Sequence, residues 1–72
     1  MKTVDNLVQR AYDIGYQEAR EQCRNVPACR SKAMNELMQE VKNGLLPLIK
    51  GYNRGVYDAM SRLAWEALNE AQ

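Results

Sequence analysis

Two helix-breaking points divide an otherwise helix-forming chain into three segments. Residues 25–27 read Asn-Val-Pro, and residues 43–47 read Asn-Gly-Leu-Leu-Pro. Proline suits the first turn of a helix but not its interior, and glycine commonly follows a helix end. Alternating runs of β-branched residues are absent, and strong helix formers dominate. The sequence therefore predicts one all-α domain over residues 1–72, with helices at about 3–24, 27–42 and 47–70.

The three segments differ in how much of their surface is apolar. The first carries a stripe at helical spacing, made of Val4, Leu7, Val8, Ala11, Ile14, Gly15 and Ala19. The second has a narrower stripe of Met34, Leu37, Met38 and Val41. More than half the circumference of the third is apolar, which two short helices would not cover. We expect a three-helix up-down-up bundle, or a helical hairpin with a long third helix, that forms a dimer.

A short pattern of Tyr, Gly and Ala occurs twice. Its members are Tyr12, Gly15 and Ala19 in the first segment and Tyr52, Gly55 and Ala59 in the third. Gly and Ala four residues apart lie on one helix face and let another backbone approach closely. Because the first and third helices of an up-down-up bundle run parallel, the two patterns would lie at similar heights. We expect them to mark a contact between these helices or pairing across a dimer axis.

The aromatic residues point to a binding surface on the third segment. Trp65 falls on its polar side near Arg54, and Tyr57 falls at the margin of its apolar arc. Tyr, Trp and Arg are the residue types enriched in binding hot spots. We therefore expect Trp65, Tyr57 and Arg54 to anchor a protein partner. The alternative is that the aromatic rings cover the edge of the core with their polar ends in water.

Cys23 and Cys29 flank the first break. Three interpretations stay open. The cysteines are two unpaired, partly buried thiols, or they form a disulfide, because the ends of successive helices can come within bridging distance, or they have a redox role, although their spacing is not that of the C-x-x-C motif. A disulfide would indicate a periplasmic or secreted protein. The N-terminus has no apolar signal core, and no apolar run approaches the ~20 residues of a membrane span. The chain without a disulfide is therefore expected in the cytoplasm, away from membranes.

Several kinds of chemistry are excluded by composition. Histidine is absent, so Ser31 and Ser61 lack the usual base and zinc lacks its usual nitrogen ligand. Glu36 and Glu40, one turn apart, are typical of a solvated helix face. We expect no enzymatic activity, no metal and no cofactor. The net charge of +1 argues against strong non-specific binding of nucleic acid.

Residues 51–60, which read Gly-Tyr-Asn-Arg-Gly-Val-Tyr-Asp-Ala-Met, resemble segments of small orphan helical proteins encoded by bacteriophages and other mobile elements. The resemblance covers this segment alone and carries over no functional residue. It implies a small factor that binds and modulates or inhibits a host protein, or that neutralises a small signal.

Three functional interpretations follow. The leading one is a non-enzymatic interaction protein that self-associates and binds a protein partner. A second is a binder of nucleic acid or of a small anionic ligand, through the basic residues Arg20, Arg24, Arg30, Lys50 and Arg54. A third is a periplasmic or secreted helical factor stapled by a disulfide between Cys23 and Cys29.

Overall fold

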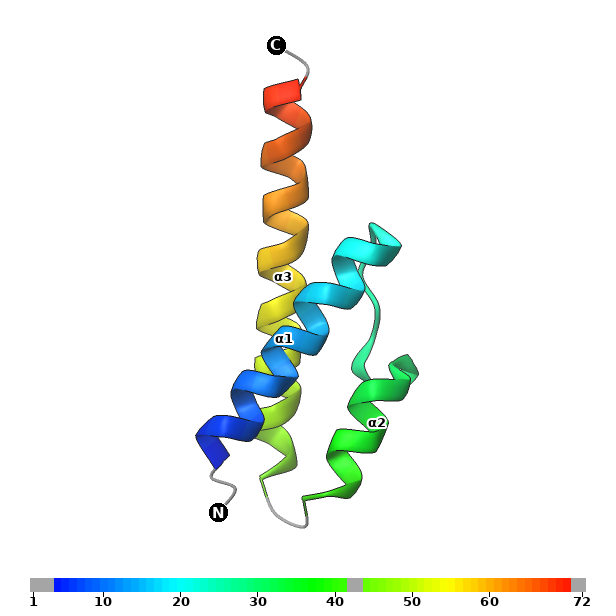
Figure 1. The fold of residues 1–72 in the computed structure, drawn as a ribbon, viewed down its shortest axis with the longest axis vertical. Helices are drawn as coiled ribbons and strands as arrows, with labels where there is room; N and C mark the ends of the chain where they lie inside the picture. The colour runs from blue at the N-terminus through cyan, green and yellow to red at the C-terminus, as the bar shows by residue number, and fades with distance from the viewer. Residues whose placement is uncertain (1–3, 42–43, 71–72) are drawn as a thin grey trace.

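The computed structural model describes residues 4–41 and 44–70, and its regular elements in these two ranges are all helical. Helix α1 spans Val4–Gln22, the 3₁₀ turn η1 spans Ala28–Arg30, α2 spans Lys32–Gln39 and α3 spans Leu45–Glu70. Helices α1 and α3 cross while rising in the same direction, and α2 runs back the opposite way (Figure 1). The predicted all-α fold, with a long third helix packed on the first, is confirmed.

Helix α1 ends at Gln22 because Cys23 adopts the left-handed backbone conformation, with a φ of 56°. The next amide, of Arg24, donates to the carbonyl oxygen of Ala19 at 3.3 Å, which is the long bond of a Schellman motif. Glycine adopts this conformation freely, whereas another residue does so at roughly 1 kcal/mol. The helix therefore stops two residues before the predicted end at Arg24.

The second helix begins five residues later than the predicted opening at Pro27. Pro27 is extended, with a ψ of 143°, and is followed by the single turn η1. Helix α2 starts at Lys32, directly after Ser31, whose side-chain oxygen accepts a hydrogen bond from the Met34 amide at 3.1 Å. A serine cap of this kind satisfies an otherwise unpaired amide and contributes ~1 kcal/mol. The expectation of one continuous helix from Pro27 is corrected accordingly.

Helix α3 begins at Leu45, two residues before its predicted opening. Pro47 still lies in the first turn, where a helix needs no amide donor. Gly44, with a φ of 86°, makes the turn into the helix. Thr3, where the first helix is predicted to begin, and Asn43, the first residue of the second predicted break, lie outside the described residues.

The hydrophobic core lies where α1, α2 and the first half of α3 meet. Its buried apolar residues are Leu7, Ala11, Ala19, Met34, Leu37, Leu48, Tyr52, Val56 and Ala59. No described residue of α3 after Ala59 is buried, and the C-terminal end of α3 projects past α1 (Figure 1). The wide apolar arc of α3 is therefore covered within the chain only over its first half.

The crossing of α1 and α3 is too close to admit a Cβ atom. A Cβ built on Gly15 would lie closer than 3.0 Å to the carbonyl oxygen of Tyr52, and one on Gly55 would lie equally close to that of Tyr12. Ala19 and Ala59 are fully buried beside this crossing. The repeated Tyr-Gly-Ala pattern thus makes a direct contact between two helices of one chain.

Candidate functional site

Trp65 and Tyr57 expose most of their side chains on α3, with exposed fractions of 57% and 71%. They are eight residues apart, which is about 12 Å along a helix axis. Arg54 is also exposed and lies one turn before Tyr57. At about 100° per residue, the three side chains share a sector of roughly 80° that faces away from the buried Tyr52 and Ala59. The structure thus brings the three predicted binding residues onto one outer side of α3.

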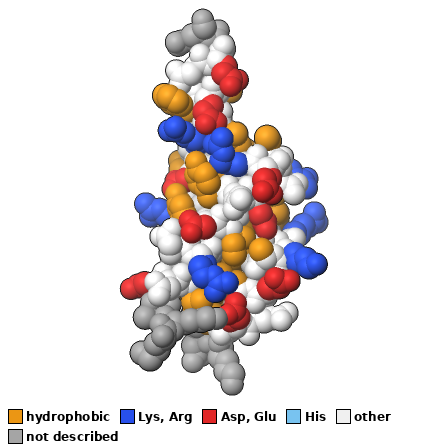
Figure 2. Space-filling view, viewed as in Figure 1, with side chains coloured by type: hydrophobic (Ala, Val, Ile, Leu, Met, Phe, Trp, Pro, Cys, Tyr) orange, Lys and Arg blue, Asp and Glu red, His pale blue; other side chains and the backbone are white. Residues whose placement is uncertain are grey.

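This exposure bears on the alternative that the aromatic rings cover the edge of the core. Both rings are more than half exposed, so neither belongs to the buried core. Figure 2 shows apolar side chains at the surface, among charged ones, on α3 and between α3 and α1.

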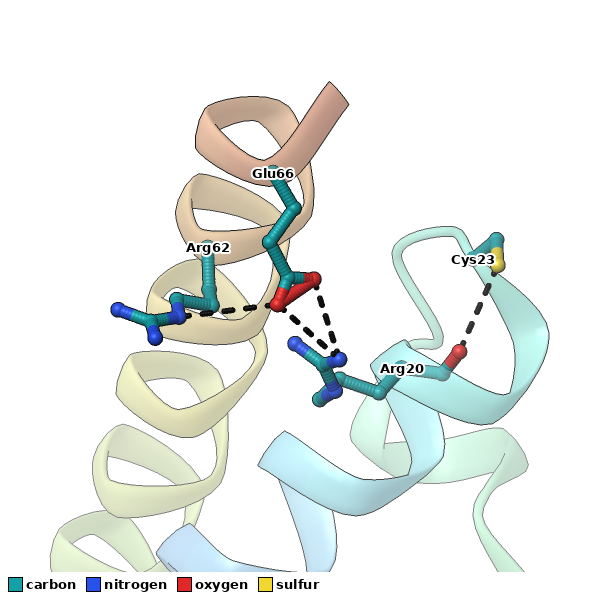
Figure 3. Close-up of polar contacts among 4 residues, drawn as sticks. All are labelled: Arg20, Cys23, Arg62 and Glu66. Atoms are coloured by element: carbon teal, nitrogen blue, oxygen red, sulfur yellow. Dashed lines mark hydrogen bonds and ion pairs between the residues drawn. The ribbon is translucent and has the colours of Figure 1, made fainter. Parts of the chain in front are cut away.

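A series of contacts between charged side chains connects Trp65 to α1. The Arg62 guanidinium carbon lies 5.2 Å from the centroid of the Trp65 ring, within the range of a cation–π contact. Arg62 also pairs with Glu66 at 3.7 Å, and Arg20 of α1 donates to both oxygens of Glu66 at 3.2 and 3.4 Å (Figure 3). The hydrogen bond from Arg20 to Glu66 raises the pKa of Arg20. These contacts link α1 to the projecting part of α3 and, through Arg62, to the Trp65 ring.

A row of side chains on α1 lines the same edge of α3. The Tyr12 hydroxyl donates to Asp58 at 2.5 Å, and this bond raises the pKa of Tyr12. The Tyr12 and Tyr16 rings stack with centroids 6.3 Å apart, and Arg20 lies 5.9 Å from the Tyr16 centroid. The row borders a shallow groove on α1 that is completed by Asp13, Gln17 and Glu21. The carboxylates of Asp58 and Glu66, at the α1–α3 edge, are therefore both engaged within the chain.

A groove of about 610 Å³ lies between the beginning of α1 and the first half of α3. It is lined by Val8, Pro47, Lys50, Gly51, Arg54, Tyr57 and Asp58. At its base α1 and α3 approach closely, since a Cβ on the buried Gly51 would lie 3.0 Å from Cγ1 of Val8. Two of the predicted binding residues, Arg54 and Tyr57, thus border one groove, and Trp65 lies outside its lining.

The two cysteines are free and exposed, and they are not within disulfide distance. Cys23 occupies the left-handed turn after α1, where its thiol contacts the carbonyl oxygen of Arg20 at 3.5 Å (Figure 3). Cys29 lies in η1, beyond the extended residues 25–27. The expected alternative of a Cys23–Cys29 staple, and a periplasmic or secreted protein inferred from it, is therefore not supported.

A buried polar cluster around Tyr52 was not anticipated from the sequence. The Tyr52 hydroxyl lies 2.8 Å from the carbonyl oxygen of Val26 and 3.2 Å from a carboxylate oxygen of Glu18. Ser31 donates to the other Glu18 oxygen at 2.7 Å. Burial, followed by the charge of Glu18, raises the pKa of Tyr52 to about 12. The cluster ties α1, the connection and the cap of α2 to α3, which makes it a structural centre.

Within the described residues, no group of three acidic or cysteine side chains is placed to hold a metal ion. In the same ranges, no helix is long and apolar enough to cross a membrane. Glu36 and Glu40, considered above as a carboxylate pair, are both exposed, and Glu40 pairs with Arg10 at 3.7 Å. Ser31 caps α2 and Ser61 is exposed.

No protein-family model matches the chain, and no curated protein or solved structure shows significant similarity to it. An assignment of function therefore depends on the residues of this chain and their arrangement.

Proposed function

We propose that this protein is a small non-enzymatic interaction module that binds a protein partner through the outer side of α3. The observation that carries the proposal is the exposure of Tyr57 and Trp65, at 71% and 57%, on the side of α3 that faces away from the core. Water contact with large apolar rings is unfavourable by about 25 cal/mol per Å² of apolar surface, and an interface would remove it. Tyr, Trp and Arg are also the side chains that dominate binding hot spots.

Contacts between this surface and the rest of the chain support the proposal. Tyr57 and Arg54 lie beside Gly55, where α3 is pressed against the backbone of α1. Trp65 is held by Arg62, which is itself linked through Glu66 to Arg20. A binding surface already ordered before association loses less conformational entropy on binding. The resemblance of residues 51–60 to proteins of mobile elements adds that the module modulates the partner that it binds.

Self-association is the second part of the proposal. After Ala59, α3 carries a second apolar sector that begins at Met60, which packs against the core, and continues through Leu63, Ala64, Ala67 and Leu68, with Leu68 69% exposed. A groove of about 470 Å³ adjoins it and is lined by Asn25, Val26, Pro27, Asn53, Val56, Tyr57 and Met60. We propose that the α3 helices of two copies pair antiparallel and cross at Ala64. In this arrangement Leu68 of one copy lies against the groove of the other copy, at the end where Met60 stands. The small side chain of Ala64 permits close approach at the centre.

Affinity capture from the native host, with the tagged full chain as bait, tests partner binding. We expect a stoichiometric partner that is lost with Trp65→Ala and with Tyr57→Ala. The matched control is Leu45→Ala, which removes a leucine that is 41% exposed from the first turn of α3, about half a turn around the helix from Arg54. Each variant is first checked for helical circular dichroism. A partner retained by both aromatic variants, or lost equally with Leu45→Ala, would contradict the proposed surface.

A further inference from the structure

We infer that the groove between α1 and α3 binds an acidic peptide segment of the partner, with Lys50 and Arg54 holding its carboxylates. An apolar side chain of the same segment enters the groove beside Tyr57. The inference rests on the proposed function and adds the chemistry of the partner to it.

The charges around the groove are the first observation in favour of an acidic occupant. Residues 45–57 contain Lys50 and Arg54 and no acidic residue. Both side chains are exposed, and neither forms an ion pair with any residue in the described ranges. The one carboxylate that lines the groove, that of Asp58, accepts the hydroxyl proton of Tyr12 at 2.5 Å. Lys50 and Arg54 together carry two positive charges against the single negative charge of Asp58, so the rim of the groove is positive on balance.

The spacing of the two basic residues, Lys50 and Arg54, suits the binding of a peptide. Lys50 and Arg54 are four residues apart, so their Cβ atoms lie about 5–6 Å from each other on one helix face. Two acidic residues one helical turn apart, or two apart in an extended segment, present carboxylates at a similar separation. Arg54 offers a planar fork of donors and Lys50 a compact charge, so the two together fix the direction of the bound segment.

The apolar floor of the groove is the surface on which the apolar side chain of the peptide would pack. Val8, Pro47 and the backbone at Gly51 form a surface with no polar side chain, and the exposed ring of Tyr57 stands at its edge. A second hollow of about 410 Å³ continues the groove towards Gln9 and Tyr12. The main groove, at about 610 Å³, falls in the size range of sites that enclose a small ligand or side chains. A Leu, Ile or Phe of the partner fits there.

Peptide carboxylates match this site better than a nucleic-acid backbone does. A nucleic acid is bound by many phosphate contacts along a basic stripe. Here only two basic residues, Lys50 and Arg54, line the groove, and they are followed along α3 by Asp58, whose carboxylate also lines the groove, and by Glu66. Arg20, a further base on this side, is already paired with Glu66. The chain's net charge is +1. An occupant with two local carboxylates can pair with Lys50 and Arg54 at the rim and place one apolar side chain against Val8 and Pro47, away from Glu66.

The test begins with a displayed library of random 12-residue peptides selected on the full-length protein. We expect the enriched peptides to combine Asp or Glu with a large apolar residue. The strongest peptide is then synthesised with a fluorophore, and its dissociation constant is measured by anisotropy. Lys50→Glu and Arg54→Glu should each weaken binding about tenfold or more, and added salt should weaken binding to the wild type. Arg30→Glu makes the same change of charge in η1 and should bind as the wild type does.

Three results would overturn the inference: no enriched peptide, enriched peptides without acidic residues, or equal binding by Lys50→Glu, Arg54→Glu and the wild type. Displacement of the acidic peptide by a mixed-sequence single-stranded 12-nucleotide DNA at lower concentration than by unlabelled peptide would assign the site to nucleic acid instead. If the selected peptides are neutral and their binding is lost in Tyr57→Ala, only the acidic character of the partner would be contradicted, and the proposed binding surface would stand. Peptides indifferent to both Tyr57→Ala and Trp65→Ala would count against the proposed function as well.

Discussion

The Cα of Gly55 in α3 faces the backbone of Tyr12 in α1 so closely that a Cβ atom would overlap the Tyr12 carbonyl oxygen. A backbone cannot move aside as the end of a flexible side chain can, so this contact sets how near the two helices lie. The same crossing places Gly15 against the Tyr52 carbonyl. The positions of Arg54 and Tyr57, on either side of Gly55, depend on this spacing.

The first prediction concerns Gly55. Gly55→Ala should lower the free energy of unfolding by about 1–3 kcal/mol, because the added methyl group forces the helices apart. The intrinsic preference of helices for alanine, about 1 kcal/mol, acts in the opposite direction and is outweighed. Urea unfolding followed by circular dichroism measures the change. Asn53→Ala, at an exposed position of the same helix, is the control and should be neutral or slightly stabilising. A higher melting temperature for Gly55→Ala would mean that the crossing is looser than described.

The second prediction concerns the end of α1. Cys23→Gly should raise the free energy of unfolding by about 0.5–1 kcal/mol, because Cys23 has a φ of 56° and glycine adopts this conformation without steric conflict. Cys29→Gly, in the 3₁₀ turn, should give no gain because positive φ is not required there. Thermal unfolding of both variants under reducing conditions provides the comparison. Equal effects of the two substitutions would argue against a left-handed cap at Cys23.

The third prediction is a loss of stability in alkaline solution. The pKa of Tyr52 is about 12 in the folded protein and about 10 in an unfolded chain. The unfolded state therefore loses its proton first, and the free energy of unfolding falls as pH rises from 10 to 12. The loss attributable to Tyr52 approaches roughly 2–3 kcal/mol at the upper end of this window. Tyr12, whose pKa is also raised, contributes in the same direction.

Tyr52→Phe tests this assignment. The variant should be less stable at pH 7 by about 1–2 kcal/mol, because the Val26 carbonyl and Glu18 lose a donor. Between pH 10 and 12 its stability should fall less steeply than that of the wild type. Denaturant unfolding at a series of pH values measures both effects. An unchanged slope would show that Tyr52 ionises in the folded protein as it does in the unfolded chain.

The fourth prediction concerns assembly. Leu68→Glu should abolish the proposed dimer, because it places a charge in the apolar sector beyond Ala59 where Leu68 is 69% exposed. Leu46→Glu introduces the same charge at a similarly exposed leucine near the start of α3 and should leave the dimer intact. Sedimentation velocity at micromolar concentration distinguishes the species. A wild-type protein that sediments as an 8.3 kDa monomer would contradict self-association.

The sequence was informative where structure depends on local signals. Pro27 and Gly44 marked the two connections, the apolar spacing located three helices, and the Tyr-Gly-Ala repeat pointed to the crossing at Gly15 and Gly55. The angular position of Trp65 on α3 was also enough to place the ring away from the core.

Features that depend on tertiary contacts were not recoverable from local patterns. A left-handed Cys23 has no signature, since glycine is the residue expected at such a position. The Tyr52 cluster joins Glu18 to residues 13 and 34 positions away. The groove beside Arg54 requires Val8 of α1 to meet Gly51 of α3, which the pattern of neither helix reveals alone.

The central claim is that the outer side of α3 binds a protein partner with Trp65 as an anchor. Its most direct test is the dissociation constant of the captured partner for wild type and Trp65→Ala, measured by titration calorimetry. The account predicts a loss of about 2 kcal/mol or more, roughly thirtyfold in affinity, with helical content and oligomeric state unchanged. An unchanged dissociation constant would contradict the claim, and loss of the dimer in Trp65→Ala would assign the residue to assembly instead.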